Sequence, residues 1–191
     1  MSSDEKELLI AIMVDDQNVS LDFHENRVGV DYKKLVQFIE KKYEALNPKI
    51  VLKKLYTAVN PKLTKAQRNF FYKIQNEETG FIVETRTIKT IILSDGGTKR
   101  KADVDTLLAF DMAYYIHTYD LLVILSGDSD YVGNLETLLF HGKQILIITT
   151  QQAMSSEIYE LSEADDDTEL IFFDGYQQEF GICKKGSREK K

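Results

Sequence analysis

Aspartates follow two apolar stretches of the sequence, at the points where buried strands are expected to end. Asp15 comes directly after the run LLIAIMV at 8–14. Asp128 and Asp130 come after the run LLVIL at 121–125, within the sequence SGDSDY. Because the carboxyl ends of parallel strands meet at one edge of a sheet, we expect these carboxylates to share one rim.

A rim of clustered carboxylates has a specific chemical use. Like charges at close range repel, so a fold normally tolerates them only when a cation or shared protons neutralise them. Ligands that are all oxygen select hard cations, here Mg²⁺ or Mn²⁺, and a water on such an ion can attack a phosphodiester. The sequence therefore predicts a metal site with nuclease chemistry. Its candidate catalytic and metal-ligating residues are Asp15, Asp105, Asp128 and Asp130.

Three aspartates around an expected helix at 103–117 compete for a place at this site. We favour Asp105, because it lies in the first turn and the helix should start at the same rim. Asp111 lies about 9 Å further along the axis and roughly 120° around it, so both cannot easily bind one ion. Asp103 is a candidate N-cap and an alternative ligand to Asp105. The supporting residues expected around the site are Asn18, Asp103, Asp111, Ser126 and Asp16.

Apolar runs alternate with amphipathic segments along the chain, which predicts the elements that position these residues. The expected strands are 8–14, 50–59, 81–86, 121–125, 143–150 and 170–176, and the expected helices are 31–46, 63–77, 103–117, 131–142 and 155–164. Strands alternating with helices imply right-handed βαβ units, so we expect an α/β fold with a mostly parallel central sheet and helices on both faces. The segment 87–94 is β-rich and predicts a strand extension or a flap.

The composition is that of one globular domain. The chain has 191 residues, of which 43% are apolar and 29% charged, with a formal net charge of −7. We expect a folded domain at 1–176 and a basic, flexible tail at 177–191, because the tail lacks hydrophobic periodicity. The apolar runs are too short to span a bilayer, and the polar N-terminus does not resemble a signal peptide. We therefore expect no membrane association and a cytoplasmic location.

Basic residues gather locally despite the acidic total. Lys99, Arg100 and Lys101 directly precede the helix that carries Asp105, so they should flank the carboxylate rim. Binding to a phosphate backbone needs Lys and Arg side chains that displace its counterions. We expect these three residues to hold a nucleic acid beside the site.

Three segments, in order along the chain, resemble the motifs of a known family. These are VDDQNV at 14–19, KADVDTLLAFDM at 101–112 and SGDSDYV at 126–132. They resemble the motifs of NYN domains, the LabA-like branch of the PIN-like nuclease superfamily. The polar positions of those motifs correspond to Asp15, Asn18, Asp105, Asp111, Ser126, Asp128 and Asp130. Asp16 departs from the family pattern, which usually has a small residue there. The spacing from Lys101 is one residue off the commonest form if Asp105 is the ligand, which makes Asp103 the alternative.

The resemblance implies a Rossmann-like three-layer α/β/α sandwich that uses Mg²⁺ or Mn²⁺ to hydrolyse RNA. RNA would then be the partner of Lys99, Arg100 and Lys101. One alternative is a catalytically weak or inactive RNA-binding or scaffold protein with the same fold. Another is a receiver-like phosphorylation domain, which also has acids after its first strand, although 81–86 lacks the phosphoacceptor aspartate. A homodimer or a protein partner is compatible with each of these.

Overall fold

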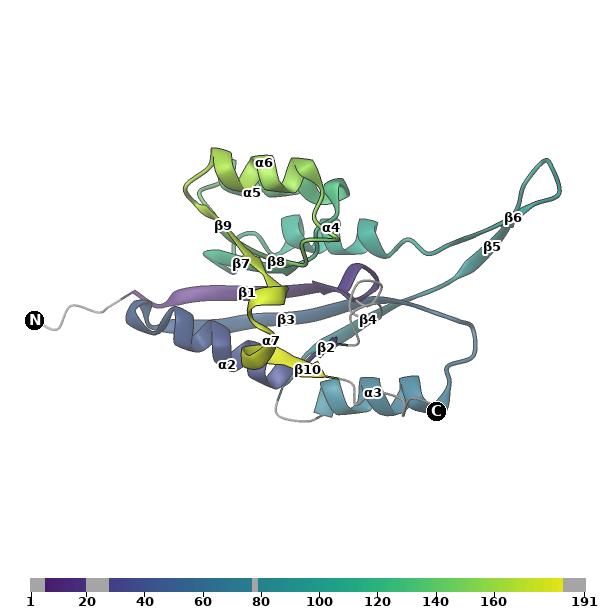
Figure 1. The fold of residues 1–191 in the computed structure, drawn as a ribbon, viewed down its shortest axis with the longest axis horizontal. Coiled ribbons are helices and arrows are strands. Elements are labelled where there is room, and N and C mark those ends of the chain that lie inside the picture. The colour runs from purple at the N-terminus through teal and green to yellow at the C-terminus, as the bar shows by residue number, and fades with distance from the viewer. Residues whose placement is uncertain (1–5, 20–27, 77–78, 184–191) are drawn as a thin grey trace, which may run out of the picture.

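A parallel sheet forms the centre of the computed structural model, which describes residues 6–19, 28–76 and 79–183 (Figure 1). Within these ranges the sheet is six-stranded, with the order β4-β3-β1-β7-β8-β9, and every neighbouring pair is parallel. Its strands are β1 (Leu8–Asp15), β3 (Pro48–Val59), β4 (Ile82–Thr87), β7 (Leu121–Leu125), β8 (Gln144–Thr149) and β9 (Thr168–Phe172). The strand order reverses between β1 and β7, which is where doubly wound sheets bind ligands.

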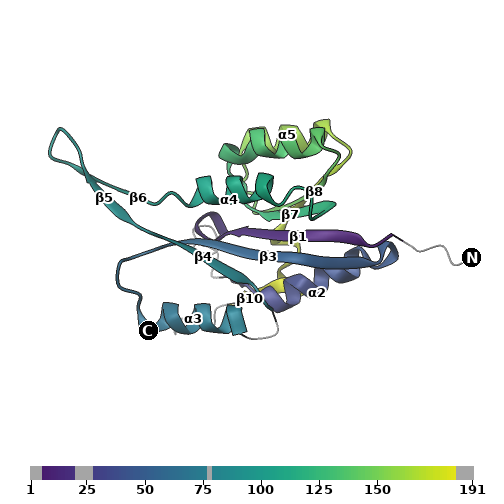
Figure 2. The same cartoon turned by 180° about the vertical axis from the view of Figure 1, so that it is seen from behind.

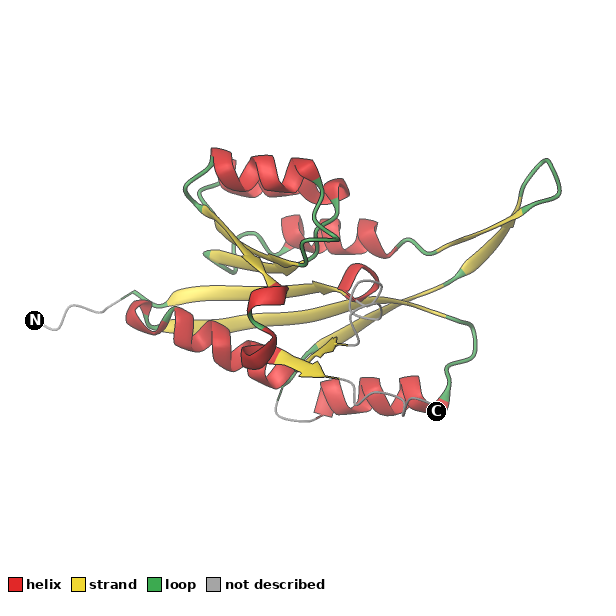
Figure 3. Ribbon diagram, viewed as in Figure 1, coloured by secondary structure: helices red, strands yellow, loops and turns green. Residues whose placement is uncertain are grey.

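Helices cover both faces of this sheet, so the predicted three-layer α/β/α class is confirmed (Figure 3). One face carries α2 (Tyr32–Lys42), α3 (Lys65–Asn76) and α7 (Gln177–Phe180), and the other carries α4 (Val104–Tyr114), α5 (Val132–Phe140) and α6 (Ser156–Ala164) (Figure 2). Short 3₁₀ turns are η1 (Glu44–Leu46), η2 (Ser129–Tyr131) and η3 (Phe173–Gly175). No helix in the described ranges is long and apolar enough to cross a membrane.

The continuous apolar run of β1 is explained by burial on both faces. Ile10 and Ile12 pack in the core on the α2 side, whereas Ala11 and Met13 pack in the core on the α4 side. Alternate side chains of a strand point to opposite faces, so a central parallel strand needs apolar residues at every position. The strand order also excludes the receiver-like alternative, because receiver sheets follow the order 2-1-3-4-5.

A two-stranded arm projects from the body between β4 and α4 (Figures 1 and 2). It consists of β5 (Lys89–Ile92) and β6 (Thr98–Lys101), which pair antiparallel. Gly96 at its tip has φ +81°, a conformation that favours glycine. The β-rich segment at 87–94, predicted as a strand extension or a flap, is therefore mostly one strand of a hairpin.

The C-terminal segment contradicts the prediction of a flexible tail that begins at 177. Residues 177–180 form α7, and β10 (Gly181–Cys183) pairs antiparallel with β2 (Val28–Val30). Phe180 is fully buried against Phe38 and Phe173. The sequence prediction failed because a four-residue helix and a three-residue strand are too short for a periodic signal. Residues 184–191 of the predicted tail lie outside the described residues.

Candidate active site

Asp15 ends β1 and is almost fully buried, with 2% of its surface exposed. Its Oδ1 accepts hydrogen bonds from the backbone N–H groups of Gln17, at 3.0 Å, and Asn18, at 3.2 Å, at the start of a helical turn at 16–19. Burial raises the pKa of Asp15 to about 6, and the nearby charge of Asp105 adds to this increase. The carboxylate is thus held in one orientation and is costly to ionise.

The loop after β7 brings further polar groups to Asp15. The Ser126 hydroxyl lies 3.5 Å from Asp15 Oδ2 and accepts the N–H of Asp128 at 3.3 Å. The N–H of Gly127 donates to Asn18 Oδ1 at 3.0 Å, so the loops after β1 and β7 are tied together. Asp128 caps η2 by accepting the N–H of Asp130 at 3.0 Å.

Gly127 is required by the close packing of this loop. A Cβ atom at this position would lie 2.5 Å from the carbonyl oxygen of Ala153 and closer still to Thr149 Oγ1. Such approaches are far inside van der Waals contact, so any larger residue would displace the loop. The predicted site residues on either side of Gly127 therefore depend on the segment after β8.

Tyr131 connects the predicted carboxylates, although the sequence analysis did not select it. Its hydroxyl lies 3.1 Å from Asp15 Oδ2 and 3.4 Å from Asp105 Oδ1, and the residue is buried. Burial raises the pKa of Tyr131 well above its ordinary value, and the charges of Asp15 and Asp105 raise it further, so the phenol keeps its proton. The only signal in the sequence was its position directly after SGDSD. An aromatic residue at that position is equally compatible with packing in the core and with a role in the site.

The aspartates at the start of α4 have different surroundings. Burial raises the pKa of Asp105, and the charges of Asp128 and Asp130 raise it further. Asp103 stands at the N-cap of α4, but its side chain makes no capping hydrogen bond, which corrects the sequence prediction. Instead its carboxylate is 3.3 Å from the ammonium of Lys101. Of the two alternatives, Asp105 is the one beside Asp15 and Tyr131.

Two supporting residues point away from this group. Asp111 is buried and lies 2.6 Å from Lys54 Nζ and 2.8 Å from the Tyr56 hydroxyl, both on β3. Asp16 accepts a hydrogen bond of 2.6 Å from the Thr57 hydroxyl. Both residues therefore attach the site-bearing segments to β3.

The predicted basic cluster lies on β6, at the root of the arm. Lys99 and Lys101 are exposed, and Lys101 lies near enough to Asp105 to lower its pKa, against the larger effects of burial and Asp128. The side chain of Arg100 lies outside what the structure describes. Lys101 is therefore next to the carboxylates, whereas the place of Lys99 and Arg100 beside them stays a prediction.

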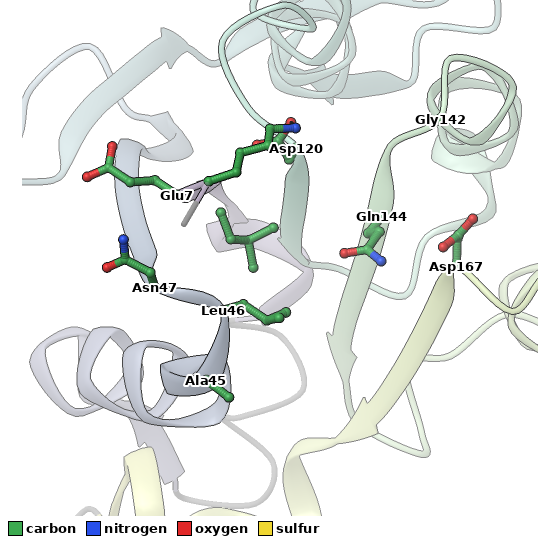
Figure 4. Close-up of a pocket in the computed structure, with 10 residues that line it drawn as sticks. Glu7, Ala45, Leu46, Asn47, Asp120, Gly142, Gln144 and Asp167 are labelled. Atoms are coloured by element: carbon green, nitrogen blue, oxygen red, sulfur yellow. The ribbon is translucent and has the colours of Figure 1, made fainter. Parts of the chain in front are cut away.

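A pocket of about 560 Å³ lies at the opposite edge of the sheet, where the strands begin (Figure 4). Two of its three acidic residues have partners: Asp120 accepts the N–H of Leu9 and pairs with Lys6, and Glu7 pairs with Lys49. None of the predicted site residues lines it. We therefore place the candidate active site at the carboxylates and not in this pocket.

The family comparison agrees with this geometry. The family model described as "NYN domain" matches residues 9–170, most of the chain. The chain belongs to the NYN domain family. The matched range contains the ends of β1 and β7, the arm and α4, and hence every residue of the candidate site.

Two known proteins are similar to this NYN domain protein. The "Low amplitude and bright protein LabA" of Synechococcus elongatus is 24% identical over 151 residues, which cover 78% of this chain and 77% of LabA. A crystal structure of a protein of unknown function from Vibrio parahaemolyticus is 23% identical and superposes with a TM-score of 0.68 over 95% of this chain and 100% of that chain. The latter confirms the α/β fold. Membership of a nuclease superfamily makes nuclease activity the first function to consider.

Proposed function

We propose that this NYN domain is a metal-dependent ribonuclease that hydrolyses RNA phosphodiester bonds at Asp15, Asp105, Asp128 and Asp130. The observation that carries the proposal is the single hydroxyl of Tyr131 within hydrogen-bond distance of both Asp15 and Asp105. Two carboxylates, from β1 and α4, thus converge where the strand order of the sheet reverses. The NYN family to which the chain belongs is part of a nuclease superfamily.

The donor set fits a hard divalent cation. Burial and the charges of Asp128 and Asp130 raise the pKa of Asp105, and burial and the charge of Asp105 raise the pKa of Asp15, so without a cation the ionised carboxylates are unfavourable here despite Lys101. In the described part of the chain, no three Asp, Glu, His or Cys side chains form a group that could hold an ion. Mg²⁺ commonly binds through one or two carboxylates and keeps several waters, so Asp15 and Asp105 suffice. A bound Mg²⁺ or Mn²⁺ would supply an activated water and neutralise charge on the phosphate.

The residues of the chain would orient and position the reactants. Backbone N–H groups hold Asp15 Oδ1, which leaves Oδ2 directed toward Tyr131 and Asp105. Lys99, Arg100 and Lys101 would bind the RNA backbone beside α4, because each ammonium or guanidinium releases counterions from phosphate. Asp130 is exposed in η2, directly before α5, where it would be the residue to accept a proton from water.

A cleavage assay tests the proposal. Purified protein should cut end-labelled single-stranded RNA slowly with Mg²⁺ or Mn²⁺, and EDTA should abolish cutting. Asp105→Asn should abolish cleavage, whereas the matched control Asp120→Asn, at the opposite edge of the sheet, should cleave at the wild-type rate. A wild-type rate for Asp105→Asn would disprove the proposed site.

The second candidate function is an inactive RNA-binding or scaffold protein. The full hydrogen bonding of Asp15 favours it, because Tyr131, Ser126 and two backbone N–H groups already satisfy the carboxylate. This alternative expects RNA binding that needs Lys99 and Lys101, no cleavage in any metal, and no effect of Asp105→Asn on RNA affinity.

A further inference from the structure

The two faces of the arm differ in chemistry. Residues directly opposite each other in an antiparallel pair lie on the same face, and alternate residues of a strand share that face. Lys89, Lys99 and Lys101 therefore lie on one face, together with Ile91. The other face presents Ile92, which is 78% exposed, opposite Thr98, and the same register assigns the paired positions Thr90 and Arg100 to it.

The outer face of α4 is exposed although it carries no charge. Its exposed positions are Thr106, Phe110, Ala113 and Tyr114. Phe110 and Tyr114 are 60% and 67% exposed, and their rings stack with centroids 5.7 Å apart. A surface helix normally presents charged residues to water, so an uncharged aromatic outer face indicates a covered surface.

The arm and α4 are arranged so that a second copy of the chain could cover both. The arm continues outward from the N-terminal end of α4, which itself lies on the sheet, so the arm projects beyond the body roughly in line with that helix (Figures 1 and 2). A two-fold axis at their junction would place the arm of each copy along α4 of the other. This satisfies the condition for a symmetric dimer, in which one patch is complementary to itself.

The distribution of charge along the chain also favours a second copy as the partner. Residues 86–101 contain five basic residues and one acidic residue, although the whole chain has a net charge of −7. The arm is thus cationic and the remainder of the chain strongly anionic, so an arm is attracted to the body of another copy. A two-stranded ribbon is also only marginally stable alone, and packing on a helix would stabilise it.

We propose that the chain forms a two-fold symmetric dimer in which Ile92 of each arm packs on Phe110 and Tyr114 of the other copy. The contact uses the face of the arm that carries Ile92. The face with Lys89, Lys99 and Lys101 stays open to solvent, so these lysines remain available to RNA in the dimer. The dimer does not depend on the ribonuclease proposal.

Sedimentation equilibrium over a range of concentrations tests the dimer. Wild-type protein should sediment as a dimer, and Ile92→Glu or Phe110→Glu should each raise the dissociation constant by roughly tenfold or more, as the loss of an interface anchor does. The double variant Ile92→Lys with Phe110→Glu should recover much of the association, because each arm then brings a lysine to a glutamate. Tyr72→Glu is the matched control: Tyr72 is 66% exposed on α3, on the opposite face of the sheet, and its replacement should leave the dimer intact.

Three results would overturn the proposal. The first is wild-type protein that sediments as a monomer throughout, and the second is dimerisation of both single variants like wild type, which would place the interface elsewhere. The third is unchanged association of the variants with weaker binding of single-stranded RNA, which would make Phe110 and Tyr114 a base-stacking surface. Because all these residues are exposed, circular dichroism and thermal melts of the variants should match wild type.

Discussion

Lys54 and Asp111 form a buried ion pair, with the ammonium 2.6 Å from the carboxylate, that joins β3 to α4. Glu84 on β4 lies 3.0 Å from the same ammonium, and the Tyr56 hydroxyl donates to Asp111. Burial alone would lower the pKa of Lys54, but its hydrogen bonds to Asp111 and Glu84 outweigh that effect and raise it, so the side chain stays charged. This pair holds the helix that carries Asp105 against the sheet.

Replacing Asp111 by Ala should lower the free energy of unfolding by about 3–5 kcal/mol, because the change leaves Lys54 and Tyr56 short of a buried partner. Urea unfolding measures this value. The matched control is Lys49→Ala, which breaks an exposed pair with Glu7 and should cost less than about 1 kcal/mol. Equal losses in the two variants would mean that the buried pair has no special structural role.

Replacing Gly127 by Ala should destabilise the protein by about 1–3 kcal/mol or more, since the new Cβ would overlap Ala153 and Thr149. It should also weaken Mn²⁺ binding, because the displaced loop carries Ser126 and Asp128. Thermal melts with EDTA and with Mn²⁺ report both effects. Gly133→Ala in α5 meets nothing within 4 Å and should instead stabilise the helix by roughly 0.5–1 kcal/mol.

The raised pKa of Asp15 predicts a pH dependence of stability without metal. The folded state binds this proton more tightly than the unfolded state, so ionisation costs stability as the pH rises from the ordinary pKa of 3.8 to about 6. Above that range wild type should lose about 3 kcal/mol relative to Asp15→Asn, whose side chain does not titrate. Urea unfolding of both proteins in EDTA, at about pH 4 and pH 7, measures the difference. Parallel pH profiles would assign Asp15 an ordinary pKa.

Replacing Tyr131 by Phe should weaken Mn²⁺ binding while the fold stays intact. The Tyr131 hydroxyl lowers the pKa of both Asp15 and Asp105 by hydrogen bonding, so its removal favours their protonated forms. Since a metal must displace those protons, the loss should be greatest near pH 6 and smaller at higher pH. Calorimetric titration with Mn²⁺ at several pH values tests this. A pH-independent loss of affinity would indicate a purely structural role.

Removing residues 177–191 should destabilise the domain strongly, because Phe180 and the pairing of β10 with β2 are lost. The Phe180→Ala variant alone should cost about 3–5 kcal/mol. Its control is Phe140→Ala, in which an exposed phenylalanine is shortened and the change should stay within about 0.5 kcal/mol. If the truncated chain unfolded like the full chain in urea, the C-terminal segment would be dispensable for stability.

The parallel sheet and the shared edge at its strand ends could be predicted from the sequence, because both follow from the local pattern of apolar and polar residues. Unbroken apolar runs identify buried parallel strands, and the rule that their carboxyl ends share an edge places Asp15 near Asp128. The choice of Asp105 over Asp111 follows from helix geometry alone. Asp111 has a separate role, because it forms an ion pair with Lys54.

Contacts between distant segments could not be predicted in this way. Tyr131 meets Asp15 and Asp105 only after β1, α4 and η2 are assembled, and no spacing in the sequence encodes that meeting. Asp103 has the residue type of an N-cap, but the lysines of the arm compete for its carboxylate. In both cases three-dimensional neighbours decide what a side chain does.

The pairing of β2 with β10 also constrains when the protein can fold during synthesis. Residues 28–30 are made before most of the central sheet, yet their hydrogen-bonding partners at 181–183 are made only after β9, the last strand of that sheet along the chain. Phe180, which closes the core beneath α2, arrives equally late. Contacts between segments far apart in the sequence form slowly and leave apolar surface uncovered until they do. The nascent polypeptide should therefore expose this part of its core until residues 180–183 have been made and can pack.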